Sequence, residues 1–183
     1  MNNIVYGTVT SDDQLKQILK LQKKNLFTTI TKEERKSEGF VTVSHSFDVL
    51  KRMNDAQPHI IAKDGDTVVG YALCMLKQFK ADVPLLVPMF DFMDSVLEIK
   101  NLSDLKFVIM GQICIDKAYR KQGVFGELYK KMSSELKENF DIIITEVNTK
   151  NKRSSFAHQA VGFETLDMHS AHGEEWELIL LKL

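Results

Sequence analysis

The sequence of 183 residues contains little cysteine and little proline, and it has no long uninterrupted apolar run. Its two cysteines, Cys74 and Cys114, each lie inside an apolar stretch, where a free thiol normally acts as a small hydrophobic side chain. A reducing compartment suits them. No window reaches the roughly 18 consecutive apolar residues of a membrane helix, and the N-terminus does not resemble a signal peptide. We therefore expect a cytoplasmic protein without a membrane partner.

The sequence also lacks an excess of either charge, with 24 Lys and Arg against 25 Asp and Glu. This balance gives no electrostatic reason to expect a nucleic-acid partner. The His, Cys, Asp and Glu residues show no metal-ligand spacing, so no metal is expected. Composition and length are those of one ordinary globular domain. A homodimer is left open.

Hydrophobic periodicity predicts a helix over residues 11–26. Shorter helices are expected over 31–39, ending at Gly39, and over 46–55, before Pro58. Two β-rich runs on either side of Lys63–Asp66 predict a hairpin, because an Asp-Gly pair suits a tight turn. Residues 77–106 are expected to form an insertion with partial structure, including a helix within 89–99.

Strand and helix alternate after this insertion. Residues 107–115 and 141–147 read as strands, with a helix from about Gly123 to Asn139 between them, which implies a parallel pair with a right-handed crossover. A helix over 151–163 and two final strands follow. The fold class predicted by this order is α/β, a mixed sheet layered with helices.

The segment AYRKQGVFGELYKKM, residues 118–132, predicts an anion site. A turn from a strand into a helix gathers unpaired N–H groups at the positive end of the helix dipole. Gly123 and Gly126 permit positive φ angles and close approach of a ligand, while Arg120 and Lys121 add positive charge. Alternatively, the glycines only relieve a tight turn and helix packing. The nucleoside-triphosphate and dinucleotide motifs are not matched.

The longer segment ICIDKAYRKQGVFGELYKKM resembles the acetyl-CoA-binding region of the GNAT superfamily of N-acetyltransferases. The family signature is [RQ]-x-x-G-x-[GA] after an apolar strand. Arg120 and Gly123 match this signature, and Ile113 and Ile115 supply the apolar pair. Phe125 departs from the small residue of the last position, although Gly126 follows at once.

A second segment, NKRSSFAHQAVGF, resembles the family pattern N-x-x-A-x-x-x-Y-x-x-x-G-F. Asn151, Gly162 and Phe163 keep their spacing, with Ser154 at the alanine position and His158 at the tyrosine position. The element order is similar to that of the family everywhere except 77–106. The resemblance implies a single GNAT-like domain over 1–183, with a mostly antiparallel sheet and a parallel βαβ pair at the CoA site.

The resemblance further implies that acetyl-CoA is the co-substrate and that the acceptor is an amine of a small molecule or a peptide. It implies cofactor contacts at these positions: Ile113, Cys114, Ile115, Arg120, Lys121, Gln122, Gly123, Val124, Phe125, Gly126, Asn151 and Ser154.

Two residues are candidates for catalysis. His158 stands where the family often has a general-acid tyrosine, and alternatively it only packs on its helix. Glu146, at the end of a predicted strand, is a candidate base, and alternatively a neighbouring Arg or Lys holds it. Gln112 could orient the acceptor.

The other histidines carry less weight in the sequence. His45 and His59 are expected to be exposed or to cap elements, and His169 to lie around the final hairpin turn.

Two alternatives to an enzyme stay open. One is a GNAT-like sensor that binds acyl-CoA without turnover, and the other is a phosphate-ligand binder outside the superfamily. The acceptor is expected to contact residues 25–46 and 84–98, whose acidic and aromatic residues would suit a small amine or polyamine.

Overall fold

The computed structural model describes residues 3–31, 33 and 40–183. The chain forms two compact units, Met1–Met75 with Met110–Glu135 and Leu76–Ile109 with Leu136–Leu183. Strand β4 (Phe107–Ile115) begins in the second unit and ends in the first. The prediction of one domain over 1–183 stays a prediction.

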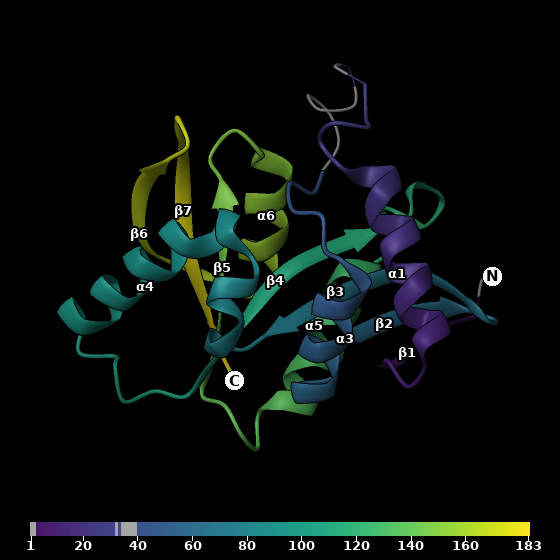
Figure 1. Cartoon of the computed structure of the whole chain (residues 1–183), viewed down its shortest axis with the longest axis horizontal. Coiled ribbons are helices and arrows are strands. Elements are labelled where there is room, and N and C mark those ends of the chain that lie inside the picture. Colours follow the sequence, from purple (N-terminus) through teal and green to yellow (C-terminus); the bar gives the residue numbers. More distant parts are fainter. Residues whose placement is uncertain (1–2, 32, 34–39) are drawn as a thin grey trace. The chain divides into compact units, whose positions relative to one another are not determined.

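The described strands are hydrogen-bonded in the order β1-β2-β3-β4-β5-β7-β6 (Figure 1). The β4–β5 pair is parallel, whereas β1–β2, β2–β3, β5–β7 and β6–β7 are antiparallel. The predicted mixed sheet with one parallel βαβ pair and flanking helices is therefore confirmed.

The first unit contains a strand that the sequence pattern did not reveal. Strand β1 (Ile4–Thr8) pairs with β2 (Ile60–Asp64), which forms the expected hairpin with β3 (Thr67–Met75). Gly65 in the hairpin turn has a φ of 56°. The alternation of β1 is short and weak, so its pairing with β2 is what fixes it as a strand.

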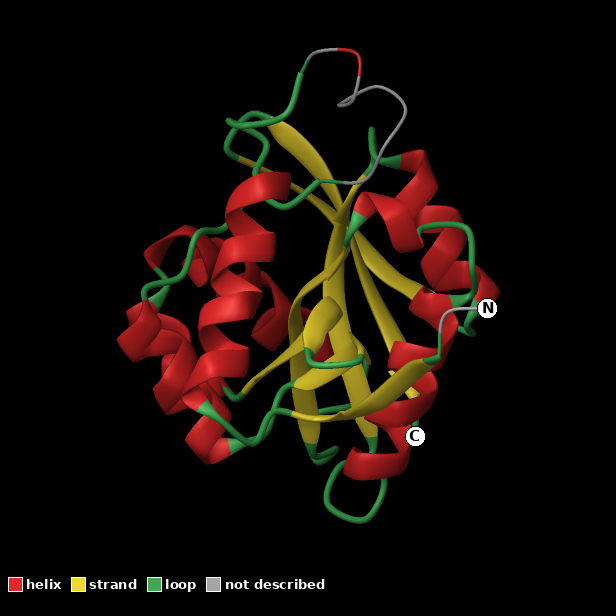
Figure 2. Ribbon diagram, turned by 90° about the vertical axis from the view of Figure 1, so that its right-hand side faces the viewer, coloured by secondary structure: helices red, strands yellow, loops and turns green. Residues whose placement is uncertain are grey.

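In the described part of this unit, three α-helices flank the strands (Figure 2). Helices α1 (Asp12–Asn25) and α3 (Phe47–Ala56) each begin after a serine whose hydroxyl accepts a main-chain N–H, as an N-cap does. The apolar residues of α1 pack with those of β2 and β3 in one core. Helix α5 (Val124–Leu136) covers the other face, because a Cβ on Gly70 of β3 would lie 3.4 Å from Val124 and Leu128. The predicted helix over 31–39 falls almost entirely outside the described residues.

The second unit contains the remaining elements. They are η1 (Lys77–Asp82), η2 (Pro84–Leu86), α4 (Val87–Ile99), β5 (Ile142–Asn148), α6 (Lys152–Ala160), β6 (Glu164–Ala171) and β7 (Glu174–Lys182). The parallel pairing joins Phe107–Ile109 to Ile142–Ile144.

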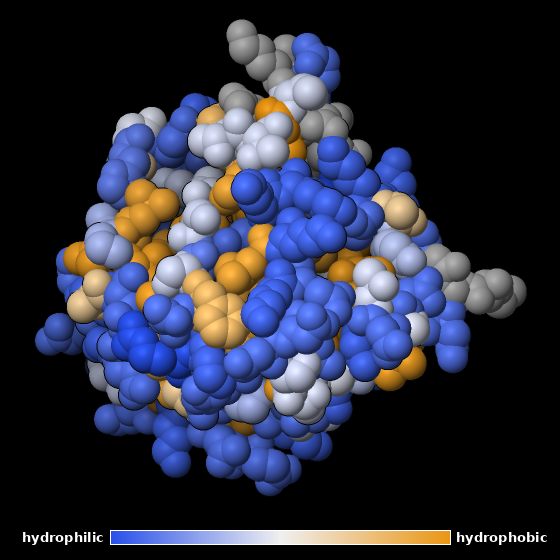
Figure 3. All heavy atoms as spheres, turned by 45° about the vertical axis from the view of Figure 1, so that its right-hand side comes forward, coloured by the Kyte–Doolittle hydropathy of each residue, from blue (hydrophilic) through white to orange (hydrophobic). Residues whose placement is uncertain are grey.

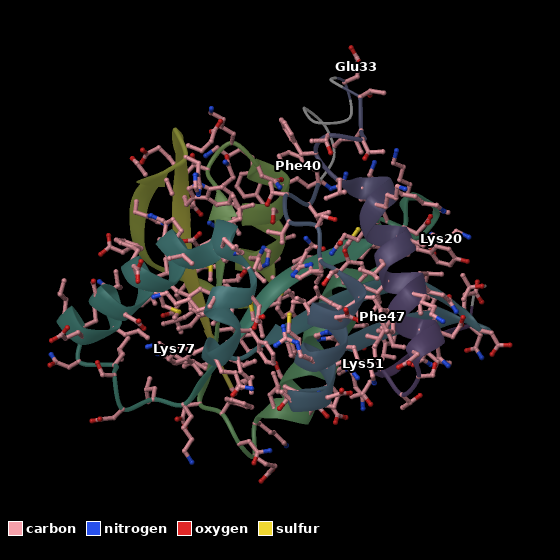
Figure 4. All side chains as sticks on the ribbon, in the orientation of Figure 1. Lys20, Glu33, Phe40, Phe47, Lys51 and Lys77 are labelled. Atoms are coloured by element: carbon pink, nitrogen blue, oxygen red, sulfur yellow. The ribbon has the colours of Figure 1, made fainter. Side chains whose placement is uncertain are left out.

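The stretch 77–106 folds largely into helical turns, and the helix predicted within it is α4. Lys77 of η1, labelled in Figure 4, lies 2.7 Å from the Asp94 carboxylate of α4, and Lys80 pairs with Asp91. Helix α4 contacts β6, and Phe90 and Met93 are among its buried residues. This stretch therefore covers part of the sheet.

No described helix is both long and apolar enough to cross a membrane. Hydrophilic residues occupy most of the face shown in Figure 3, with smaller apolar areas between them. Such a mixture is usual where a protein surface meets water.

His59 is a structural residue of the core. Its ring is fully buried, Nδ1 accepts a hydrogen bond of 3.1 Å from the Cys74 N–H, and Nε2 donates one of 3.2 Å to the Leu50 carbonyl. The sequence prediction that His45 and His59 are exposed or capping is wrong, since both are buried. Burial lowers the pKa of each to about 4.

These histidines predict acid sensitivity. Because the folded pKa of His59 lies near 4 and its ordinary pKa is 6.5, the unfolded chain binds more protons between these values. Its stabilising contribution is complete above about pH 6.5 and is lost as the pH falls towards 4. Urea unfolding should show a loss of about 2 kcal/mol from this residue between pH 7 and pH 5. In His59→Gln that part of the pH dependence should vanish; an unchanged pH dependence would contradict the assignment.

Candidate functional site

The turn between β4 and α5 has the backbone of an anion site. It passes through the short helix η3 (Lys117–Tyr119), and Lys121 and Gly123 then adopt φ angles of 61° and 80°. A Cβ on Gly123 would meet nothing within 4 Å, so the backbone is open there. The first N–H groups of α5, from Val124 to Gly126, have no partner within the helix by its geometry. A phosphate fits such a turn.

Lys121 is a non-glycine residue in the left-handed region. This conformation costs about 1–2 kcal/mol, and such strain persists where the surroundings enforce it. Tyr119 anchors the turn through a 2.8 Å hydrogen bond from its hydroxyl to Asp64, and Gln122 donates to the Ala118 carbonyl. The turn is thus formed by the protein's own contacts.

Arg120 joins this turn to the end of α1. Its Nε donates to the Ile115 carbonyl at 3.1 Å, and one terminal nitrogen donates to Asn25 Oδ1 at 2.7 Å. Asn25 in turn donates to the Leu21 carbonyl. Arg120 therefore adds positive charge beside the turn while its side chain holds the turn against α1. No local sequence pattern marks Asn25 as the partner of Arg120.

The residues of β4 before the turn alternate between two environments. Gln112 and Cys114 are buried, whereas Ile113 and Ile115 are half-buried. Burial raises the pKa of the Cys114 thiol to about 12, so the thiol is neutral at pH 7 and is a poor nucleophile.

In the second unit Glu146 and His169 form a partly buried pair. The Glu146 carboxylate on β5 accepts a hydrogen bond from His169 Nε2 on β6, and both side chains are 10% exposed. The His169 ring stacks on Phe92 of α4 with 4.2 Å between centroids. Burial raises the pKa of Glu146, and the His169 contact opposes part of that rise.

This pair corrects one expectation. The partner of Glu146 is a histidine, not the Arg or Lys considered from the sequence. His169 lies near the end of β6, close to the final hairpin turn as expected. No period of two in the sequence places His169 inward, because the register shifts between Thr165 and Asp167 and the half-buried positions are Leu166, His169 and Ala171. The pairing of β5 with β7 and of β7 with β6 brings His169 towards Glu146.

His158 is enclosed within the second unit. Only 2% of it is exposed, its Nδ1 donates to the Ser154 carbonyl at 2.8 Å, and its ring meets Phe163 edge-on. Burial lowers its pKa to about 4, so the ring is neutral at pH 7. This geometry favours the packing alternative, and the acid role stays a prediction.

Asn151 caps α6, because its side chain accepts the Ser154 N–H at 3.2 Å. The cofactor contacts expected of Asn151 and Ser154 stay predictions. The turn residues and β4 positions 113–115 belong to the first unit, whereas Glu146, Asn151, Ser154 and His158 belong to the second. Within the described ranges, no group of three or more His, Cys, Asp and Glu could hold a metal ion.

Comparison with known families decides the classification. The acetyltransferase (GNAT) family model matches residues 21–163, which is most of the chain. The chain belongs to the GNAT acetyltransferase family. Comparison with curated protein sequences gives no match. Acetyl-CoA is the acetyl donor of this family.

Solved GNAT structures share the fold. The polyamine N-acetyltransferase of Drosophila melanogaster has a TM-score of 0.73 at 9% identity, covering 99% of this chain and 100% of its own. The ribosomal-protein-S18-alanine N-acetyltransferase of Escherichia coli has a TM-score of 0.65 at 12% identity, covering 98% and 93%. An Arabidopsis thaliana protein in complex with the bisubstrate analogue CoA-Ac-MVNAL has a TM-score of 0.63 at 16% identity, covering 98% and 99%. At these identities the likeness establishes the fold alone.

The turn predicts a separation of stability from cofactor affinity. Gly123→Ala should destabilise the fold by about 1 kcal/mol through its positive φ, and it should weaken CoA binding because a methyl group enters the anion turn. Gly65→Ala is the matched control, since Gly65 also has a positive φ and open surroundings but lies in the hairpin. Thermal unfolding and calorimetric titration with CoA measure the two effects. Equal CoA affinities in the two variants would contradict the placement of the anion.

Proposed function

We propose that this protein transfers the acetyl group of acetyl-CoA directly to a primary amine. The observation that carries the proposal is the preformed turn at Lys121–Gly126, open at Gly123 and leading into α5, in a chain of this family. A base first removes one proton from the ammonium group to give the free amine. The amine nitrogen bonds to the carbonyl carbon as the carbon–sulfur bond breaks, and the proton that this nitrogen then loses balances the proton gained by the thiolate, which gives CoA and the N-acetyl product.

The residues of the first unit suit the cofactor. Backbone N–H groups from Lys121 to Gly126 would hold the pyrophosphate, and the main chain of Ile113–Ile115 would pair with the pantetheine arm as an added strand does. When bound, acetyl-CoA supplies an activated thioester. The neutral Cys114 thiol supports direct attack by the amine over an acetylated-cysteine route.

Glu146 is the proposed base. Burial raises its pKa towards pH 7, and a general base is most efficient when its pKa lies near the operating pH. The hydrogen bond from His169, whose ring Phe92 holds by stacking, fixes the orientation of the carboxylate. His169 is thus a positioning residue in this proposal.

Thiol release tests the proposal. Native protein with acetyl-CoA and a panel of amines, amino-acid amides and polyamines should release CoA thiol in step with N-acetyl product. Tight acetyl-CoA binding without release on the entire panel would instead favour the sensor.

Loss of the base predicts a change in pH dependence. Glu146→Gln should lower kcat/KM about 10²- to 10⁴-fold, the usual contribution of a general base, and should remove the acidic limb of its pH profile. Glu164→Gln, an exposed change on β6, is the control and should leave the profile intact. A retained acidic limb in Glu146→Gln would assign the base elsewhere.

His158 allows a decisive substitution. Because its ring is neutral and its Nδ1 proton is engaged with Ser154, we expect His158→Gln to lower the melting temperature while kcat per folded molecule at pH 7 changes by less than about threefold. A loss of about 100-fold in folded protein would establish the acid role instead.

A further inference from the structure

A chain of buried polar side chains crosses the core of the first unit. Gln22 of α1, Tyr71 of β3 and Gln112 of β4 are each at most 7% exposed, and His45 is 8% exposed. Gln112 Oε1 accepts from Tyr71 at 2.6 Å and from Gln22 at 2.8 Å. Gln22 also meets His45 Nδ1 at 2.9 Å. Hydrogen bonds therefore connect these four side chains into one network.

Backbone groups fix the direction of every hydrogen bond in this chain. At one end the Val43 carbonyl can only accept, so the group of Gln112 that faces it at 2.9 Å is the amide nitrogen. At the other end the His45 main-chain N–H can only donate, so the atom of Gln22 that faces it at 2.9 Å is the oxygen. Both amide orientations follow without an assumption about flips.

The tautomer of His45 follows from these orientations. The Gln22 amide nitrogen donates one hydrogen to Gln112 and the other to His45 Nδ1, so Nδ1 carries a lone pair. A neutral ring then carries its proton on Nε2. His45 Nε2 is buried and has no hydrogen-bond partner among the described residues. His59, by contrast, uses both ring nitrogens.

An enclosed N–H without an acceptor destabilises a fold, because it loses its hydrogen bond to water and gains none in the protein. The segment that carries His45 is nevertheless held firmly at its start. Val41 exchanges main-chain hydrogen bonds with Asn25 and Phe27, and Phe40, labelled in Figure 4, packs its ring 5.0 Å from that of Phe27. Residues 42–46 have no regular secondary structure and lead into α3. Such a segment can shift slightly when an oxygen reaches Nε2.

We propose that His45 Nε2–H donates a hydrogen bond to an amide carbonyl oxygen of the acceptor. The acceptor is then the amino group of an amino-terminal residue or an amino-acid amide. This inference rests on the proposed function. A polyamine has no oxygen and leaves the N–H unpaired, and the polar chain around His45 contains no cation to neutralise a buried carboxylate. A buried donor that hydrogen-bonds a substrate oxygen selects against an analogue that lacks this oxygen, because the donor is then left unpaired.

The first test is binding, which needs no turnover. Long-range ¹H–¹⁵N NMR of the native protein at pH 7 should show His45 protonated on Nε2 only. With CoA present, alaninamide should shift the His45 Nε2–H resonance, whereas isopropylamine, which replaces the amide by a methyl group, should not. The opposite tautomer, no shift, or equal shifts with both amines would overturn the proposal.

The second test is selectivity. The kcat/KM ratio of alaninamide to isopropylamine should fall about 10-fold in His45→Phe, the effect of one neutral hydrogen bond. Tyr71→Phe is the matched control, because it removes a bond of the same polar chain and leaves the His45 donor in place. Equal ratios in native protein and His45→Phe would refute the role of His45. An amide-specific NMR shift without thiol release on any amine would instead refute the proposed transfer reaction and retain the binding site.

Discussion

Two buried amide side chains, one turn apart on α1, hold the first unit together around β4. Gln22 bonds to Gln112 within the strand, and Asn25 accepts from Arg120 in the turn that follows it. Each amide is at most 2% exposed, so removing one partner would leave a polar group buried without compensation. The main chain around Gly123 consequently has a fixed position relative to α1 before any anion binds. Preorganisation of this kind reduces the ordering that binding requires.

The second unit uses its buried polar groups differently. The Glu146 and His169 pair is ionisable, whereas the chain from Tyr71 to His45 is neutral throughout. Burial raises the pKa of the Glu146 carboxylate, which makes it a stronger proton acceptor near pH 7. A neutral network instead keeps the same donors over a wide pH range. One arrangement suits proton transfer, and the other suits recognition.

Local pattern predicted the features that local physics determines. The helical period, the Asp-Gly hairpin and the glycine turn could be predicted from the sequence, because each depends on neighbours a few residues away. Pairings between distant residues were not, since Arg120 and Asn25 are 95 positions apart and Glu146 meets His169 only through sheet register. The burial of His45 and His59 was missed for the same reason. No signal in a polar side chain tells whether its partners lie in water or in a core.

Gly70 limits how the molecule can change. A Cβ there would touch Val124, Leu128 and the Cys114 carbonyl at 3.4–3.5 Å, so the space beside Gly70 holds a methyl group and nothing larger. Any longer side chain must push α5 away from β3, and Val124 directly follows Gly123. A larger residue at position 70, inside the unit, would therefore also displace the turn around Gly123. Under the proposed function, engineering of cofactor affinity could begin at this interior residue.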